Sequence, residues 1–193
     1  MSVKIIQKDN PILRQKAKEV PFNEINSEKI KNIVKQMSKA LSESANGVGL
    51  AAPQIGVSLA MFLISEEVKN KSPHLLAKHS ERYEDKTAEK ITPEEKKKQK
   101  HFVFINPRLI KSSQKKALMT EGCLSIEGVF GNIKRSRQVV VEAYNEKGEK
   151  FRVGASGLFA QVLQHEINHL NGELFTDKAE KIKKNSANQK IIG

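Results

Sequence analysis

The feature that most constrains this chain is the sequence Q-H-E-I-N-H at residues 164–169, in which two histidines lie four positions apart. Residues at this spacing stack on one face of an α-helix, so His165 and His169 can bind one metal ion if the segment is helical. The apolar residues around it recur at helical spacing, and Ser156 precedes them in an N-cap position. The sequence therefore predicts a buried helix over about residues 156–172 that carries a metal site.

Between the two histidines lies Glu166, which can approach a water at such a site without coordinating the ion. The site needs a third ligand, but no histidine follows His169, and Phe175 stands where one group of metalloproteases has its third histidine. Cys123, the single cysteine, can supply a thiolate and leave a fourth position for water. The alternative is that Cys123 is a small buried apolar residue and that the histidines are hydrogen-bonded core groups.

Composition limits the class of protein. The chain has 193 residues, 38% of them hydrophobic and 29% charged, which suits one globular domain, with room for an insertion. A single cysteine excludes an intramolecular disulfide framework and favours a reducing compartment. The apolar stretches are shorter than the roughly 20 residues of a membrane helix, and residues 1–11 do not resemble a signal peptide. We therefore expect a cytosolic type of protein with no membrane partner.

Regular patterning occurs in two parts of the chain and is interrupted between them. Residues 66–100 carry 10 Lys or Arg and 8 Asp or Glu residues but few apolar ones, which predicts an exposed insertion, either partly helical or disordered. Apolar residues at helical spacing over 30–41 follow Ser27, and two strand-like runs over 138–153 flank a turn with Gly148. This order favours an α+β fold, with antiparallel sheets packed around a central metal-binding helix.

Three segments in this order resemble the peptide deformylase family, whose signatures are G-x-G-L-A-A-x-Q, E-G-C-L-S and Q-H-E-x-x-H. They lie at Gly47–Gln54, Glu121–Ser125 and Gln164–His169. Weaker similarity covers Asn10–Arg14 and Ile105–Pro107. Any one of these motifs can arise by accident, but three in register are very specific.

The resemblance implies a metal-dependent hydrolase that removes the N-terminal formyl group from N-formylmethionine of newly made polypeptides and releases formate. It also implies that Cys123, His165 and His169 bind one divalent metal ion, commonly Fe(II), for which Zn, Ni or Co can substitute. The sequence itself does not identify the native metal, because this set of ligands suits all four ions.

Carried over by position, the resemblance makes Glu166 the acid/base residue. Gln54 and the backbone N–H of Leu124 would stabilise the oxyanion, and Gly49 would help to hold the peptide backbone. Three apolar residues are expected to line the pocket for the methionine side chain, unless they are ordinary core contacts: Val48, Leu158 and Val162.

The resemblance covers most of the chain, which we therefore expect to be a single catalytic domain over residues 1–193. The charged insertion at about 66–100 and a basic C-terminal tail at about 178–193 lie outside it. One departure falls within the metal motif, where Asn168 occupies a position that is usually aspartate in the family. If this side chain supports the metal site, the lost charge could change metal affinity by about 10–100-fold.

Two other classes of function stay open at this point. A zinc endopeptidase would use a different third ligand and cleave unformylated internal peptide bonds. A basic ribosome- or RNA-binding protein is suggested by the net charge of +12 and by the five lysines and one glutamate within residues 178–193. With 5% aromatic residues and no recognisable module, specific nucleic-acid binding is not expected.

The expected partners are N-formylmethionyl nascent peptides and, weakly through the basic tail, the ribosome. The expected location is the bacterial cytoplasm rather than an organelle, because no leader rich in Arg and Ser is present. The sequence does not predict the oligomeric state.

Overall fold

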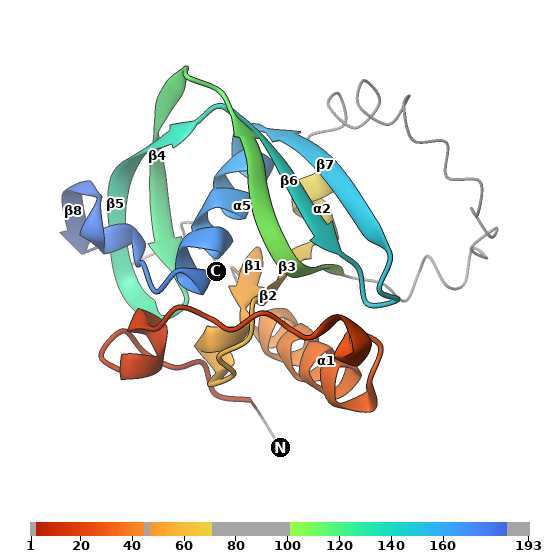
Figure 1. The fold of residues 1–193 in the computed structure, drawn as a ribbon. Helices are drawn as coiled ribbons and strands as arrows, with labels where there is room; N and C mark the ends of the chain where they lie inside the picture. The colour runs from red at the N-terminus through yellow and green to blue at the C-terminus, as the bar shows by residue number, and fades with distance from the viewer. Residues whose placement is uncertain (1–2, 45–46, 71–100, 185–193) are drawn as a thin grey trace.

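The computed structural model describes residues 3–44, 47–70 and 101–184 (Figure 1). Most of the predicted insertion and the last nine residues of the chain lie outside these ranges. The described strands are β1 (Gly49–Ala51), β2 (Met61–Ser65), β3 (His101–Ser112), β4 (Lys116–Cys123), β5 (Ile126–Ser136), β6 (Gln138–Tyr144), β7 (Lys150–Ser156) and β8 (Glu180–Lys184). The described α-helices are α1 (Glu28–Glu43), α2 (Glu66–Asn70) and α5 (Gly157–Leu170), and short 3₁₀ turns occur at Pro11–Arg14, Phe22–Glu24, Ala52–Ile55 and Phe175–Asp177.

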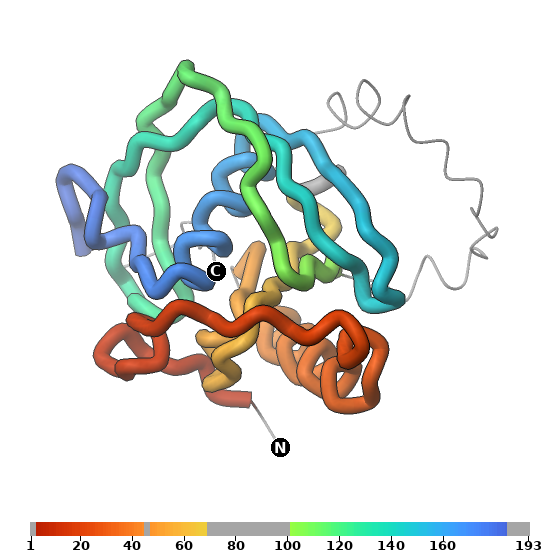
Figure 2. Tube along the Cα trace, in the orientation of Figure 1, coloured from red at the N-terminus to blue at the C-terminus, as the bar shows by residue number. Residues whose placement is uncertain are grey.

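The strands form two antiparallel sheets with α5 between them, which confirms the predicted α+β architecture (Figures 1 and 2). One sheet has five strands in the order β1-β2-β3-β6-β7, and the other has three in the order β4-β5-β8. The chain passes between the sheets from β3 to β4 and returns from β5 to β6. This arrangement brings the end of β4 and the face of α5 together.

The helix α1 begins where its sequence predicts. The hydroxyl of Ser27 accepts a hydrogen bond from the backbone N–H of Ile30 at 3.3 Å, which satisfies one of the free donors at the helix start. Its buried side chains recur on one face and pack beneath β1 and β2, in a cluster that includes Met37 and Leu63. Burial of each such side chain contributes about 1.5–3 kcal/mol.

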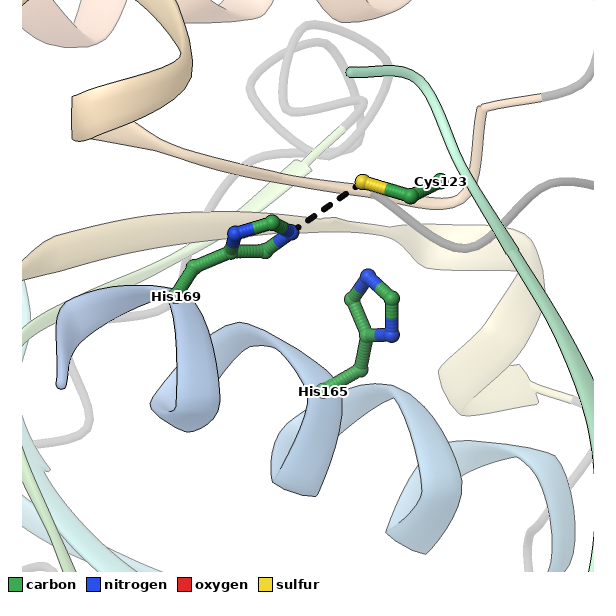
Figure 3. Close-up of side chains that lie close together, drawn as sticks. All are labelled: Cys123, His165 and His169. Atoms are coloured by element: carbon green, nitrogen blue, oxygen red, sulfur yellow. Dashed lines mark hydrogen bonds between the residues drawn. The ribbon is translucent and has the colours of Figure 1, made fainter. Parts of the chain in front are cut away.

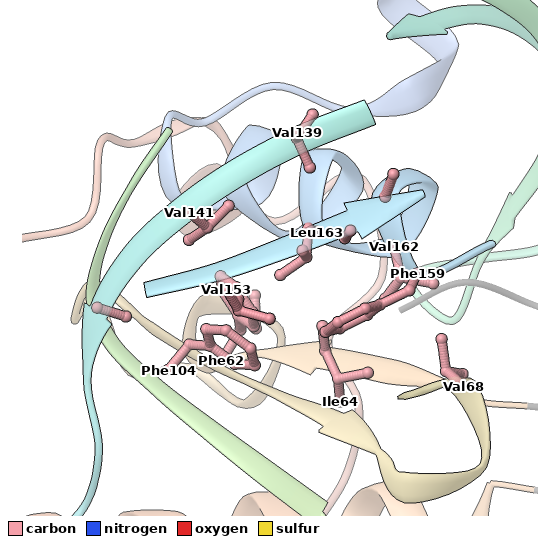
Figure 4. Packing of buried hydrophobic residues seen from close by; sticks show 14 of the residues in the cluster. Phe62, Ile64, Val68, Phe104, Val139, Val141, Val153, Phe159, Val162 and Leu163 are labelled. Carbon is pink, nitrogen blue, oxygen red and sulfur yellow. The ribbon is translucent and has the colours of Figure 1, made fainter. Parts of the chain in front are cut away.

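The helix α5 is buried on most of its circumference because both sheets cover it. Phe159, Val162 and Leu163 pack into the largest apolar cluster, against strands of the five-stranded sheet (Figure 4). In the same cluster the rings of Phe62 and Phe104 stack with their centroids 4.7 Å apart. The predicted helix is therefore confirmed, and it is fixed by packing along its whole length.

The hairpin between β6 and β7 turns at the predicted residues. The side-chain oxygen of Asn145 accepts hydrogen bonds from the backbone N–H groups of Lys147 and Glu149, both at 2.9 Å. Gly148 has a φ of 82°, a conformation that glycine adopts without steric cost. The sheet that faces α5 therefore ends in a tight, well-bonded turn.

Two segments belong to the folded structure although their charged composition suggests an exposed insertion and a tail. Residues Glu66–Asn70, at the start of the predicted insertion, form α2, and Val68 is buried in the main apolar cluster. Residues Glu180–Lys184, in the predicted tail, form β8 and pair with β5 at the edge of the smaller sheet. Within the described ranges, none of the helices is long and apolar enough to span a membrane.

Candidate metal centre

Three side chains meet in the interior between the two sheets (Figure 3). One ligand atom each from Cys123, His165 and His169 lies within 4.8 Å of the others, and all three residues are buried. The sulfur of Cys123 is 3.2 Å from Nε2 of His169. The structure thus brings together the three residues that the sequence predicts as metal ligands.

Local structure explains why these side chains converge. The two histidines are four residues apart on α5 and point from the same face toward the end of β4 (Figure 3). Cys123 is the last residue of β4, where the register with β5 shifts so that Gly122 pairs with Phe130 and Cys123 with Ile126. This irregularity ends the regular β4–β5 pairing at the residue that faces the helix.

The unsatisfied polar atoms of the site test whether a metal ion fits. Within the described part of the chain, Nε2 of His165 and both carboxylate oxygens of Glu166 are buried without a hydrogen-bond partner. Nδ1 of His169 also lacks a partner, but this ring faces Cys123 with its other nitrogen, Nε2. Buried polar atoms without partners are costly, so they indicate a missing interaction. A thiol and two imidazoles are ligands that divalent transition metals accept, and the residues therefore fit a bound ion.

The protonation of these ligands is governed by burial. Burial lowers the pKa of His169 well below its usual range, which keeps the ring neutral as a metal ligand requires. Burial also raises the pKa of the Cys123 thiol strongly. A cation beside the sulfur would reverse that shift, because it stabilises the thiolate.

A buried ion pair between Glu121 and Arg135 lies behind the three ligand side chains and bonds to one of them, His165. The Glu121 carboxylate accepts two hydrogen bonds from Arg135, at 2.8 and 2.9 Å, and lies 2.8 Å from Nδ1 of His165. Burial alone would raise the pKa of Glu121, but the hydrogen bonds with Arg135 and His165 lower it to about 2. The carboxylate thereby fixes the His165 ring with Nε2 free for the ion.

Glu166 lies on α5 next to the cluster and is fully buried. Burial raises its pKa well above the usual range, and the negative charge of Glu121 raises it further. A Cβ atom placed on Gly49 would overlap the Glu166 carboxylate and lie 3.0 Å from Val162. Only glycine therefore allows β1 to pass this close to the acid/base candidate.

The predicted oxyanion residues lie next to Cys123. Gln54 is buried, and its side-chain oxygen accepts a hydrogen bond from the backbone of Ala51 at 2.8 Å. Its amide nitrogen donates to the hydroxyl of Ser125 at 3.1 Å and lies 3.6 Å from the Cys123 sulfur. Leu124 follows Cys123 directly, so both predicted donors belong to segments next to the cluster.

The predicted pocket residues differ in how deeply they are buried. Val48 and Val162 are buried in the main apolar cluster, whereas Leu158 is only partly buried and packs against it. Val162 lies close to Gly49, and Leu158 precedes it by one helical turn. Val162 is thus placed beside the site, whereas the contact of Val48 and Leu158 with it stays a prediction.

Several residues at the site carry no clear signal in the sequence. Arg135 is twelve residues from Cys123, and its contact with Glu121 depends on the long pairing of β4 with β5. Phe175, at the position where another metalloprotease group has a histidine, instead stacks its ring on His165 with centroids 6.2 Å apart. Glu121 could have been singled out, because it belongs to the same motif as Cys123.

Comparisons with known proteins agree with this geometry. The family model for polypeptide deformylase matches residues 2–185. Peptide deformylase 1A, chloroplastic/mitochondrial, from Arabidopsis thaliana is 40% identical over 90% of this chain, and the peptide deformylase of Borreliella burgdorferi is 35% identical over 91%. The chain spans 60% of the plant protein and 87% of the bacterial one.

A solved structure shares the fold as well. The Met-Ala-Ser-bound peptide deformylase of Acinetobacter baumannii superimposes with a TM-score of 0.71 at 28% identity. The match covers 92% of this chain and 99% of that one.

Proposed function

This chain belongs to the polypeptide deformylase family, and we propose that it removes the N-terminal formyl group from N-formylmethionine of newly made polypeptides and releases formate. The observation that carries the proposal is the buried cluster of Cys123, His165 and His169 with the unpaired Glu166 carboxylate beside it. We also propose that residues 1–193 form one catalytic domain, because Leu13 and Phe175 pack in the same apolar cluster as Cys123.

Cys123, His165 and His169 would hold one divalent metal ion, which we propose is Fe(II) in the cell, with Zn, Ni or Co able to replace it. One thiolate with two imidazoles suits all of these ions, so metal supply rather than the ligand set decides which is bound. When bound, the ion supplies a Lewis acid and makes water nucleophilic near neutral pH.

Glu166 carries the proton in this reaction. It takes a proton from the water that attacks the formyl carbon and gives it to the nitrogen of the leaving amine, as the C–N bond breaks. Its buried carboxylate and its raised pKa support this role, because a proton carrier works best when its pKa approaches the working pH. The products are formate and a peptide with a free amino terminus.

Gln54 and the backbone N–H of Leu124 stabilise the negative charge that develops on the formyl oxygen. The support is the position of the Gln54 amide, 3.6 Å from the Cys123 sulfur, and the place of Leu124 next to that cysteine. Removal of one such donor from other enzymes raises the barrier by about 2.7–4 kcal/mol.

The peptide backbone binds along β1, and Gly49 lets this strand lie close to Glu166. β1 is at the edge of the five-stranded sheet, so its outer backbone groups can pair with an extended peptide. Val48, Leu158 and Val162 take the methionine side chain, which their apolar character and the place of Val162 beside Gly49 support.

Formate release tests the proposed reaction against its main alternative. Fe(II)-loaded protein, prepared without oxygen, is incubated with formyl-Met-Ala-Ser, with Met-Ala-Ser and with a longer unformylated peptide. We expect formate from the first substrate and no cleavage of the others. Cleavage of internal bonds without formate release would instead favour the zinc endopeptidase.

We also propose weak association with the ribosome through the basic tail over 178–193, in the bacterial cytoplasm. The lysines of β8 support the first proposal, because all five residues of this strand are exposed. Cosedimentation with ribosomes should fall as salt rises, since binding to phosphates releases counterions. Cosedimentation that does not change with salt, or after deletion of residues 178–193, would refute this proposal.

A further inference from the structure

Asn168 joins two charged groups of opposite sign next to the metal cluster. Its side-chain oxygen accepts a hydrogen bond from Nη1 of Arg135, and its amide nitrogen donates one to the carboxylate of Glu173. An amide has an acceptor on one arm and donors on the other, whereas a carboxylate has acceptors only. The side chain of Asn168 therefore matches both neighbours at once.

Arg135, on one side of Asn168, is connected through Glu121 to the metal ligand His165. Arg135 uses its two other nitrogens, Nε and Nη2, to donate hydrogen bonds to Glu121 at 2.8 and 2.9 Å. Glu121 in turn fixes Nδ1 of His165 at 2.8 Å. A change in the position of the Arg135 guanidinium is thus passed on to the orientation of the imidazole.

Glu173, on the other side of Asn168, is partly exposed at the surface. Glu173 lies beyond the end of α5, and its side chain is 38% exposed. It forms an ion pair with Lys178 at 2.6 Å. The negative charge beside Asn168 is therefore supplied by Glu173 and is held in place by a lysine.

We propose that Asn168 is a positioning residue for the metal ligand His165, and that its amide is required because Glu173 already supplies the carboxylate at this place. The proposal rests on the proposed function only in that the cluster binds a metal ion. An aspartate at position 168 would put two carboxylates side by side, where their negative charges repel each other. The new carboxylate at position 168 would also compete with Glu121 for Arg135, and so draw the guanidinium away from Glu121.

A purely structural role for Asn168 makes a different prediction. The backbone N–H of Glu173 already bonds to the carbonyl of Asn168 at 2.9 Å, so the helix end is closed without the side chain. If the side chain only strengthened this helix end, its substitution would lower the melting temperature and leave metal affinity unchanged.

The test is a charge exchange between the two positions. The variants N168D, E173Q and N168D/E173Q are compared with the wild type. Zn(II) affinity is measured by competition with a chelator, and the absorption spectrum is recorded with Co(II) bound. In the double variant the carboxylate at position 168 no longer faces a second carboxylate, because a glutamine at position 173 can donate a hydrogen bond to it.

We expect N168D to lower Zn(II) affinity by about 10–100-fold, as other changes to the support of ligands do, and to alter the Co(II) spectrum. Addition of E173Q to N168D should restore most of the Zn(II) affinity and most of the wild-type Co(II) spectrum. N168L should lose affinity and gain nothing from E173Q, because leucine offers neither a donor nor an acceptor. This variant keeps the test decisive if N168D folds poorly.

N145D is the matched control. Asn145 also donates to a glutamate, Glu149, at 2.6 Å, but it lies in the hairpin turn between β6 and β7. N145D creates the same pair of carboxylates away from the metal cluster, and it should leave Zn(II) affinity and the Co(II) spectrum unchanged.

Wild-type affinity in N168D, or a failure of E173Q to restore it, would overturn the positioning role. Formate release by the wild type is measured in parallel to separate the two proposals. Absence of formate with the expected pattern of Zn(II) affinities would refute the deformylase reaction alone. Normal formate release with no change of affinity in N168D would refute the positioning role alone.

Discussion

At the scale of single residues, the balance of buried charge decides how the cluster is held. The Glu121 and Arg135 side chains are 0% and 7% exposed, so neither charge is stabilised by bulk water. Each is stabilised by the other and by hydrogen bonds to further partners, among them His165. Loss of one charge of such a pair leaves the other buried and uncompensated, which costs more than the pair itself contributes.

Arg135→Met should therefore destabilise the protein even without metal. We expect the free energy of unfolding to fall by about 3–5 kcal/mol, because Glu121 loses two hydrogen bonds and its countercharge. Urea denaturation of the metal-free protein measures this loss. Arg108→Met is the control, since Arg108 pairs with Glu19 at 3.0 Å on the surface and should contribute less than about 1 kcal/mol. Equal losses in the two variants would contradict the account.

The residues of the cluster differ in how far sequence predicts them. His165 and His169 follow from one short motif, because helical spacing alone puts both on one face. Cys123 follows from its motif once a third ligand is sought. Arg135 cannot be predicted in this way, because its contact with Glu121 arises only when β4 and β5 pair along their whole length.

At the scale of elements, the same helix, α5, packs in the apolar core and carries two of the three proposed metal ligands. Its apolar residues pack under the five-stranded sheet, and its histidines face the end of β4. The position of the metal ligands thus depends on how firmly this helix is packed. Leu163 is fully buried and lies one residue before the motif that begins at Gln164.

Leu163→Ala should cost about 2–5 kcal/mol of unfolding free energy, because it removes buried methyl groups and leaves a cavity. Leu118→Ala, on β4, should change stability little, since Leu118 is 54% exposed. Thermal and chemical unfolding of both variants measure the difference. A cost for L163A no larger than that for L118A would contradict the packing role of α5.

Elements with a strong apolar period are predicted from the sequence, and those without one are not. The helices α1 and α5 and the β6–β7 hairpin follow from spacing, caps and turn residues. β8 has no such pattern, because all of its residues are exposed and its pairing with β5 is decided by the rest of the fold. α2 is similar, since Val68 is the one buried residue among those of α2 whose side chains are described, residues 66–68.

At the scale of the whole molecule, the N-terminal segment ties together the two loops beside the cluster. The backbone N–H of Ile6 donates to the carbonyl of Gln54, and that of Lys8 donates to the carbonyl of Ser125, both at 2.8 Å. The side chain of Gln7 donates to the carbonyl of Leu124 at 3.2 Å. The segment therefore bonds to both loops that carry the predicted oxyanion donors.

Removal of residues 1–8 should lower kcat more than it raises KM, because the oxyanion donors become less fixed while the metal cluster persists. Each lost hydrogen bond is worth about 0.5–1.5 kcal/mol of stability. Steady-state kinetics with a formylated peptide, together with metal analysis, measure both effects. Gln7→Ala removes one of the three bonds and should give a smaller change in the same direction. Unchanged kcat in the truncated protein would refute this role.

We propose above all that Glu166 carries the proton beside a metal ion held by Cys123, His165 and His169. The most direct measurement is the metal content and formate release of Glu166→Gln, with Cys123→Ala for comparison. We expect E166Q to keep one metal ion per chain and to lose formate release by about 10²–10⁴-fold, whereas C123A loses the metal as well. Near-normal formate release by metal-loaded E166Q would contradict the claim.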